Sequence, residues 1–228
     1  MNEPSHTAFR VTTLLFALLL GFQSIWLFGA EIYRPGVYRL LTDTADAIEA
    51  QNGQGDAAFA AKIGAIRGVL WAESAYTYAY LLFNEKPEPG NKDSALSLTA
   101  AGFALGRAIE DGPQESGAWL LRAGLALRYP SLGFNAPEAL KMSYYTGPSE
   151  EVLVSLRLRT AAQLDSFRDV EIAEFVTRDL RMLLARNQKS TIGDAYNAGS
   201  PSGKRFIYQA VSDIDPTSLD WLRAGAKK

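Results

Sequence analysis

The sequence predicts an all-α protein with a single transmembrane helix near its N-terminus. Three observations support this fold class. Residues 11–30 carry no charged side chain, the later apolar residues recur at intervals of three and four, and no segment shows the alternation of a half-buried strand. The 228-residue chain is 47% hydrophobic and 21% charged, with a net charge of −2. This composition is typical of a folded domain and argues against nucleic acid as a partner.

Local breaks divide the chain into four parts. A proline and a glycine follow the apolar stretch, and a glycine-rich run comes before the next long apolar segment. The predicted parts are an N-terminal tail (1–10), a transmembrane helix (11–30), a juxtamembrane helix with its linker (31–56) and a helical-repeat domain (57–228).

The charge-free stretch 11–30 is long enough to cross a bilayer. Twenty helical residues span about 30 Å, the thickness of the hydrocarbon core. A cleaved secretory signal is the alternative, but its apolar region is usually shorter and ends in small residues at a cleavage site, where this chain has Phe28. We therefore expect a retained anchor that contacts the lipid bilayer, with Trp26 and Tyr33 at its exit from the membrane.

The flanking charges leave the membrane orientation nearly balanced, with Arg10 before the anchor and Arg34 and Arg39 after it. A short tail followed by an apolar run is typical of a signal anchor. We therefore expect a single-pass protein of a bacterial inner membrane, with a cytoplasmic N-terminus and a periplasmic C-terminal domain.

One face of the anchor combines small and weakly polar side chains. Such residues allow close packing and hydrogen bonding between membrane helices, although they are also common in anchors without a partner. The predicted packing residues are Ala17, Gly21, Gln23 and Ser24.

Apolar stripes and breaking residues predict a series of helices after the anchor. Asp56 is the expected N-cap of a long apolar helix, and Ser149 and Ser200 are expected to cap later ones. The juxtamembrane helix is expected over 37–50. The later helices are expected at about 56–84, 93–111, 115–129, 137–147, 149–164, 172–184, 201–214 and 216–222.

Two of the breaks, at Pro113 and Pro148, are 35 residues apart. The surrounding pattern resembles tetratricopeptide repeats, whose unit is a 34-residue helix pair. The resemblance covers residues 95–148 and weakens in its second unit, where Arg122 and Ala123 depart from the family's preferred leucine and glycine. It implies a solenoid of antiparallel helix pairs, and an irregular α-bundle is the alternative. The matching positions are Ala101, Leu105, Ala108, Ile109, Pro113, Trp119, Leu140, Ser143 and Pro148.

The resemblance also implies a partner-binding groove lined by the first helix of each pair. It assigns Leu120, Gly124 and Arg128 to this groove, with Arg159 continuing it, although both arginines are equally compatible with a solvated surface. Independently, Tyr144 and Tyr145 end a predicted helix, where amphipathic aromatics often mark contact surfaces and core packing explains at least one of them.

Chemistry-bearing residues are scarce. The chain has no cysteine and a single histidine, His6 in the N-terminal tail, which removes thiol chemistry and most zinc sites from the domain. Residues 199–204 are similar to a phosphate-binding loop but lack its spacing and its Ser or Thr.

We therefore expect no enzyme activity, catalytic residue, cofactor or metal. The expected function is a scaffold or accessory protein that binds another protein in a bacterial envelope assembly. The alternative is an integral accessory subunit that docks into a larger membrane complex through its transmembrane helix.

Overall fold

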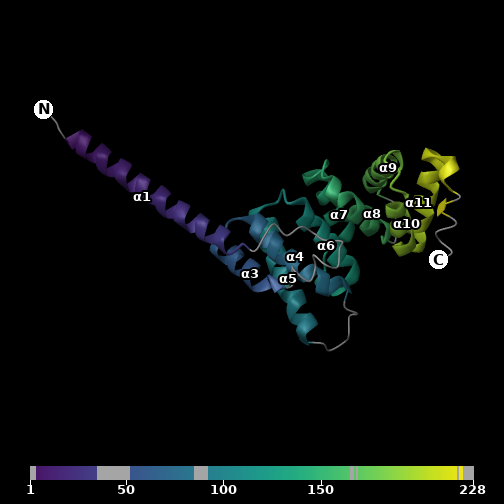
Figure 1. Ribbon diagram of the computed structural model, residues 1–228, viewed down its shortest axis with the longest axis horizontal. Helices are drawn as coiled ribbons and strands as arrows, with labels where there is room; N and C mark the ends of the chain where they lie inside the picture. The colour runs from purple at the N-terminus through teal and green to yellow at the C-terminus, as the bar shows by residue number, and fades with distance from the viewer. Residues whose placement is uncertain are drawn as a thin grey trace.

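A computed structural model describes residues 4–34, 52–84, 92–164, 167, 169–219 and 221–222. Every regular element in these ranges is a helix, so the all-α prediction is confirmed. Figure 1 shows a long rod, α1, projecting from one end of a domain whose later helices follow one another away from it. The C-terminus lies at the end opposite to the rod.

The domain consists of α-helices with three short 3₁₀ turns. In chain order they are α3 (Gln54–Ile63), α4 (Gly68–Asn84), α5 (Lys92–Asp111), α6 (Ser116–Arg128), η1 (Pro130–Leu132), α7 (Ala136–Thr146), η2 (Glu151–Leu153), α8 (Val154–Ala162), α9 (Val170–Ala185), α10 (Lys189–Ala198), α11 (Pro201–Ile214) and η3 (Pro216–Ser218).

The first helix, α1, covers Pro4–Ile32. Within it, Ala8–Ile32 has a mean hydropathy of 1.9, and none of its most apolar stretch is buried in the protein. The chain therefore has a helix near its N-terminus that is long and apolar enough to cross a membrane. The predicted juxtamembrane helix over 37–50 lies outside the described residues.

The single helix expected from Asp56 to Asn84 is instead two, α3 and α4, separated by a turn at residues 64–67. Asp56 lies in the first turn of α3 and is not its N-cap. Side chains from outside the turn hold it, because the Ala65 carbonyl accepts hydrogen bonds from Trp71 Nε1 at 3.0 Å and from Arg107 at 3.1 Å. These contacts depend on the folded arrangement, so local apolar spacing does not reveal the break.

Two further boundaries differ from the prediction. The helix expected after Ser149 starts with the turn η2, and the α-helix proper begins at Val154. No sequence pattern predicts α10, which buries only Ile192 and Ala195 and so lacks a long apolar stripe. In contrast, Ser200 caps α11 as expected, accepting a hydrogen bond from the Gly203 amide.

The domain has two hydrophobic cores that share helix α6. Leu121 and Leu125 of α6 belong to the core nearer the anchor, and Leu120 and Ala123 belong to the distal core. Helices adjacent in the chain pack as pairs, α4 on α5 and α6 on α7, and alternate helices also contact one another: α4 with α6, α6 with α8, and α8 with α10.

Candidate functional site

A network of charged side chains joins α1 to the rest of the domain. Arg34, just after α1, contacts both carboxylate oxygens of Glu73, which is buried in α4. The Glu73 carboxylate holds the pKa of Arg34 above its ordinary value. Glu31 at the end of α1 pairs with Arg67 at 2.6 Å and with Arg34 at 3.3 Å. This network ties α1 to the start of α4.

Apolar contacts and a hydrogen bond extend this junction along α1. Trp26 Nε1 donates to the Ile63 carbonyl at 2.5 Å. The Tyr33 and Phe59 rings meet edge to face, with centroids 4.7 Å apart. Ala30 is fully buried and belongs to the core nearer the anchor. The domain thus packs directly on the last turns of the anchor, and Trp26 and Tyr33 both take part.

The predicted groove residues do not share one environment. Gly124 and Arg128 of α6 are half-buried, and Arg159 of α8 is exposed. Leu120, in contrast, is only 2% exposed, because it faces the distal core. Burial removes Leu120 from the surface that a partner could contact.

The two tyrosines at the end of α7 also separate. Tyr145 is 52% exposed, with its ring edge against Phe175. Tyr144 is 1% exposed and stacks on Phe175. The structure thus buries one of the two predicted contact tyrosines, as core packing requires, and leaves only Tyr145 accessible.

Tyr144 belongs to a buried polar cluster that connects α7, α8 and α9. Its hydroxyl donates to Asp179 at 2.8 Å, and the Arg157 guanidinium lies 4.9 Å from the centre of its ring. Arg157 also donates to the Ser143 hydroxyl and carbonyl and to the Gly147 carbonyl. Burial raises the pKa of Asp179 and lowers that of Arg157. Every partner is internal, so this cluster is structural.

Acidic side chains gather around Tyr76 of α4. Burial, together with the nearby Glu150 and Glu73, raises the pKa of Glu115. Glu150 accepts a hydrogen bond from the Ser116 hydroxyl at 2.6 Å. Among the described residues no group of His, Cys, Asp or Glu has the arrangement of a metal site.

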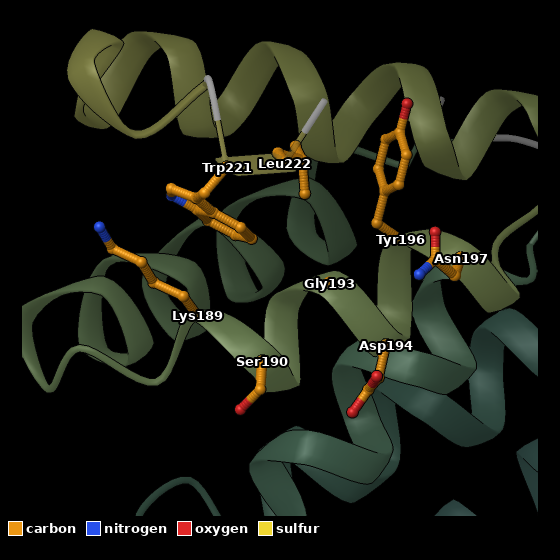
Figure 2. A pocket seen from close by; sticks show the side chains of 8 residues that line it. All are labelled: Lys189, Ser190, Gly193, Asp194, Tyr196, Asn197, Trp221 and Leu222. Atoms are coloured by element: carbon orange, nitrogen blue, oxygen red, sulfur yellow. The ribbon is translucent and has the colours of Figure 1, made fainter. Parts of the chain in front are cut away.

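A small pocket lies at the distal end of the domain, between α10 and the last described residues (Figure 2). Its volume of about 220 Å³ is below the range of about 300–1,000 Å³ that is typical of ligand pockets. Its lining residues are Lys189, Ser190, Gly193, Asp194, Tyr196, Asn197, Trp221 and Leu222.

Trp221 gives this pocket its most specific feature. Its Nε1 atom is buried and has no hydrogen-bond partner in the part of the chain that the structure describes. The Lys189 ammonium lies 5.9 Å from the centre of the same ring. A ligand group that accepts a hydrogen bond from Trp221 Nε1 and lies beside the Lys189 ammonium would suit this corner of the pocket.

The predicted packing residues of the anchor, Ala17, Gly21, Gln23 and Ser24, are all exposed on α1. A Cβ at Gly21 would meet no atom within 4 Å. The Ser24 hydroxyl donates to the Leu20 carbonyl of its own helix at 2.8 Å. This face is therefore open, and the hydroxyl is already bonded within α1.

Comparison with known proteins finds no matching family model, no matching curated protein and no matching solved structure.

Sequence reasoning missed the junction and the distal pocket. A signal for the junction is present, because Arg67 and Glu73 interrupt an apolar segment while Glu31 and Arg34 flank the anchor, so complementary charges lie in two separate segments. No comparable signal exists for the pocket. It depends on Trp221 meeting α10, where the indole lies beside Gly193.

Proposed function

We propose that this chain is a membrane-anchored, non-enzymatic scaffold or accessory protein that binds another protein through a surface formed by the half-buried and exposed side chains of its alternate helices α4, α6, α8 and α10. The observation that carries this proposal is the contact between successive members of this series. Helix pairs that stack in this way present a row of helices to one side, and repeat proteins use such rows to bind partners.

Bonds between equivalent points of neighbouring helix pairs also support a repeat. Ser116 bonds to Glu150 across 34 residues, and Tyr144 to Asp179 across 35. These separations are close to the spacing of Pro113 and Pro148, and to the length of a tetratricopeptide unit.

The junction supports the membrane part of the proposal. Ionic, aromatic and hydrogen-bonded contacts connect α1 to α3 and α4. Such a connection restricts how the domain can turn relative to the anchor. A bound partner would therefore be held at a defined position beside the bilayer, as a scaffold in an envelope assembly requires.

Charge reversal on two helices tests which surface binds the partner. Arg159 of α8 and Arg181 of α9 are both exposed arginines, so Arg159→Glu and Arg181→Glu change the net charge equally. Each full-length variant is purified from gently solubilised membranes and its partners are quantified by mass spectrometry. We expect Arg159→Glu to lower partner recovery by about tenfold, the size expected when a central interface contact is lost.

Arg181→Glu should leave partner recovery within about twofold of the unmodified chain, as a residue outside the interface does. Equal losses in the two variants would contradict the assignment to alternate helices. Recovery of the unmodified chain without any stoichiometric partner would contradict the scaffold function itself.

The second candidate function is an integral accessory subunit that docks through the anchor, and the exposed small-residue face of α1 favours it. Gly21→Leu tests this candidate and Gly29→Leu is its matched control, since a Cβ at either glycine meets no atom within 4 Å. Loss of association in Gly21→Leu alone supports docking through the anchor. Unchanged association in both variants supports the domain surface.

The proposed orientation places the domain in the periplasm of a bacterial cell. Reporter fusions at the C-terminus test it, with alkaline phosphatase active only in the periplasm and green fluorescent protein fluorescent after cytoplasmic folding. Fluorescence together with an inactive phosphatase would reverse the orientation.

A further inference from the structure

Among the described residues after α1, the turn between α3 and α4 is the part of the domain nearest to the apolar stretch of α1. Helix α3 runs antiparallel to α1: Phe59 meets Tyr33, and Ile63, one turn later in α3, meets Trp26, which lies earlier in α1. As α3 proceeds, it therefore approaches the membrane-spanning part of the anchor. The turn that follows it, residues 64–67, marks the closest point.

The level of this turn along the anchor follows from its contacts. A Cβ placed on Gly64 would lie 3.5 Å from the Ala30 Cβ, and Ala30 is the last residue of the charge-free stretch. Trp26, which reaches the Ile63 carbonyl, is about 6 Å deeper at the helical rise of 1.5 Å per residue. The turn is therefore at the height where hydrocarbon gives way to lipid headgroups.

The side chains of the turn suit that environment. Ile66 is 73% exposed, more than any other large apolar residue described outside α1. Arg67, the one charged residue of the turn, is paired with Glu31, and Arg107, which bonds to the Ala65 carbonyl, is paired with Glu110 and Asp111. Insertion of Ile66 would therefore not carry an unpaired charge of the turn into the lipid.

We propose that the α3–α4 turn is a second membrane contact, in which Ile66 inserts into the interface of the bilayer that α1 crosses. The occupant of this surface is lipid, and apolar burial drives the contact without a need for anionic headgroups. The helix and the turn together would oppose rotation and tilting of the domain. The inference rests on the proposed anchoring of α1.

Site-specific fluorescence tests the contact, because a chain without cysteine accepts a single labelled cysteine at a chosen position. Three full-length variants, Ile66→Cys, Val152→Cys and Leu18→Cys, are labelled with an environment-sensitive fluorophore and reconstituted into neutral phosphatidylcholine vesicles. Val152 is the matched control, since it is an exposed apolar residue in η2 of the distal half. Leu18 lies in the middle of the anchor and reports on α1 itself.

Quenching is measured with lipids that carry a nitroxide near the headgroup or deep in the acyl chain, and with aqueous iodide on the side of the domain. We expect shallow nitroxides to quench the label at position 66 at least about twofold more than the label at position 152, as an interfacial side chain requires. Iodide should quench position 66 less than position 152.

Two outcomes overturn the membrane contact of the turn while leaving the anchoring of α1 intact. The label at position 66 could respond to iodide as strongly as that at position 152 and not to lipid, which places the turn in water. It could also be shielded from both quenchers, which shows that protein and not lipid covers the turn. Deep-nitroxide quenching of the label at position 18, measured in its own variant under the same conditions, shows that α1 enters the bilayer. Absence of lipid quenching at both 18 and 66 would overturn the anchor and the contact together.

Discussion

The two halves of the domain hold their helices together in different ways. The core nearer the anchor is built mainly from alanine, whereas the distal core also contains many leucine, isoleucine and valine side chains. The buried alanines of the first core are Ala30, Ala61, Ala72, Ala75, Ala79, Ala101, Ala104, Ala108 and Ala118.

Small side chains bring helix backbones close together in the half nearer the anchor. At Gly68 a Cβ would lie only 2.5 Å from the Gly112 amide nitrogen and 2.6 Å from its Cα. Such contacts maximise dispersion between backbones but leave no space for an added atom. The anchor is attached to this half.

The distal half depends instead on large side chains and on the buried cluster of Arg157, Tyr144 and Asp179. Removing atoms there leaves a cavity or an unpaired polar group. The half in which helix backbones pack closely is therefore most sensitive to substitutions that add atoms. The half built on large or charged side chains is most sensitive to substitutions that remove atoms.

The largest effect is expected for Arg157→Ala in the distal half. Truncation removes three hydrogen-bonding nitrogens from the interior, and it should lower the free energy of unfolding by about 3–5 kcal/mol, the usual cost of disrupting a buried charged group. Thermal and denaturant unfolding of the full chain in detergent measure it. The neighbouring exposed Arg159→Ala should stay within about 0.5 kcal/mol of the unmodified chain. Equal effects of the two substitutions would contradict a structural role for the cluster.

Arg157→Met sharpens the same test. Methionine keeps most of the volume without the charge, and hydrophobic replacements of buried ionic groups are often near neutral. We therefore expect a smaller loss than in Arg157→Ala. The Ser143 and Gly147 carbonyls lose the Arg157 donors but keep the backbone amides of Gly147 and Glu150.

The next effect is expected from adding one methyl group in the half nearer the anchor. Gly68→Ala should lower the free energy of unfolding by about 1–3 kcal/mol, because its contact is backbone and cannot rotate away. Gly102→Ala in α5 is the control: its Cβ meets no atom within 4 Å, and it should raise stability by about 0.5–1 kcal/mol through helix propensity. Stabilisation by both substitutions would show that this half is loosely packed.

Trp26→Phe tests the attachment of the anchor. The ring remains but the hydrogen bond to the Ile63 carbonyl is lost, which should cost about 1 kcal/mol. Hydrogen–deuterium exchange should rise in the turn at residues 64–67. Trp119→Phe, which removes the matching bond to the Pro113 carbonyl, should leave exchange in that turn unchanged. Faster exchange in both variants would indicate a global loss of stability in place of a local one.

The smallest effect concerns pH. The pKa of Glu115 is raised above its ordinary value of 4.5 by burial and by Glu150 and Glu73. The folded state therefore disfavours the carboxylate, and its destabilising contribution is present above the raised pKa and disappears as the pH falls to 4.5. Glu115→Gln should accordingly raise the Tm at pH 7, by at most about 2 °C for this partly exposed group.

Below pH 4.5 the Tm of Glu115→Gln and that of the unmodified chain should converge. A variant that is less stable than the unmodified chain at pH 7 would show that the carboxylate is favoured in the folded state, contrary to the stated shift.

Most helices were predictable because their signals are local. The caps and breaking prolines at Ser200, Pro113 and Pro148 act within one turn of the chain, and the apolar stripe of α9 follows the helical period. The candidate site was harder to predict. Leu120 was expected to line a groove, and Tyr144 was one of two candidate contact tyrosines of which core packing explained at least one. The sequence does not say which face of a helix another helix will cover, and the distal core covers both residues.

By itself the sequence determined the helical fold class, the charge-free apolar stretch near the N-terminus and the absence of cysteine chemistry. These are properties of composition and of short-range period, which do not depend on neighbours in space. Only the tertiary structure decided the break between α3 and α4, the ionic attachment of Arg34 to Glu73 and the burial of Arg157. Each of these features requires groups that are distant in the chain to meet. The interactions that stabilise them therefore form only once the helices have packed.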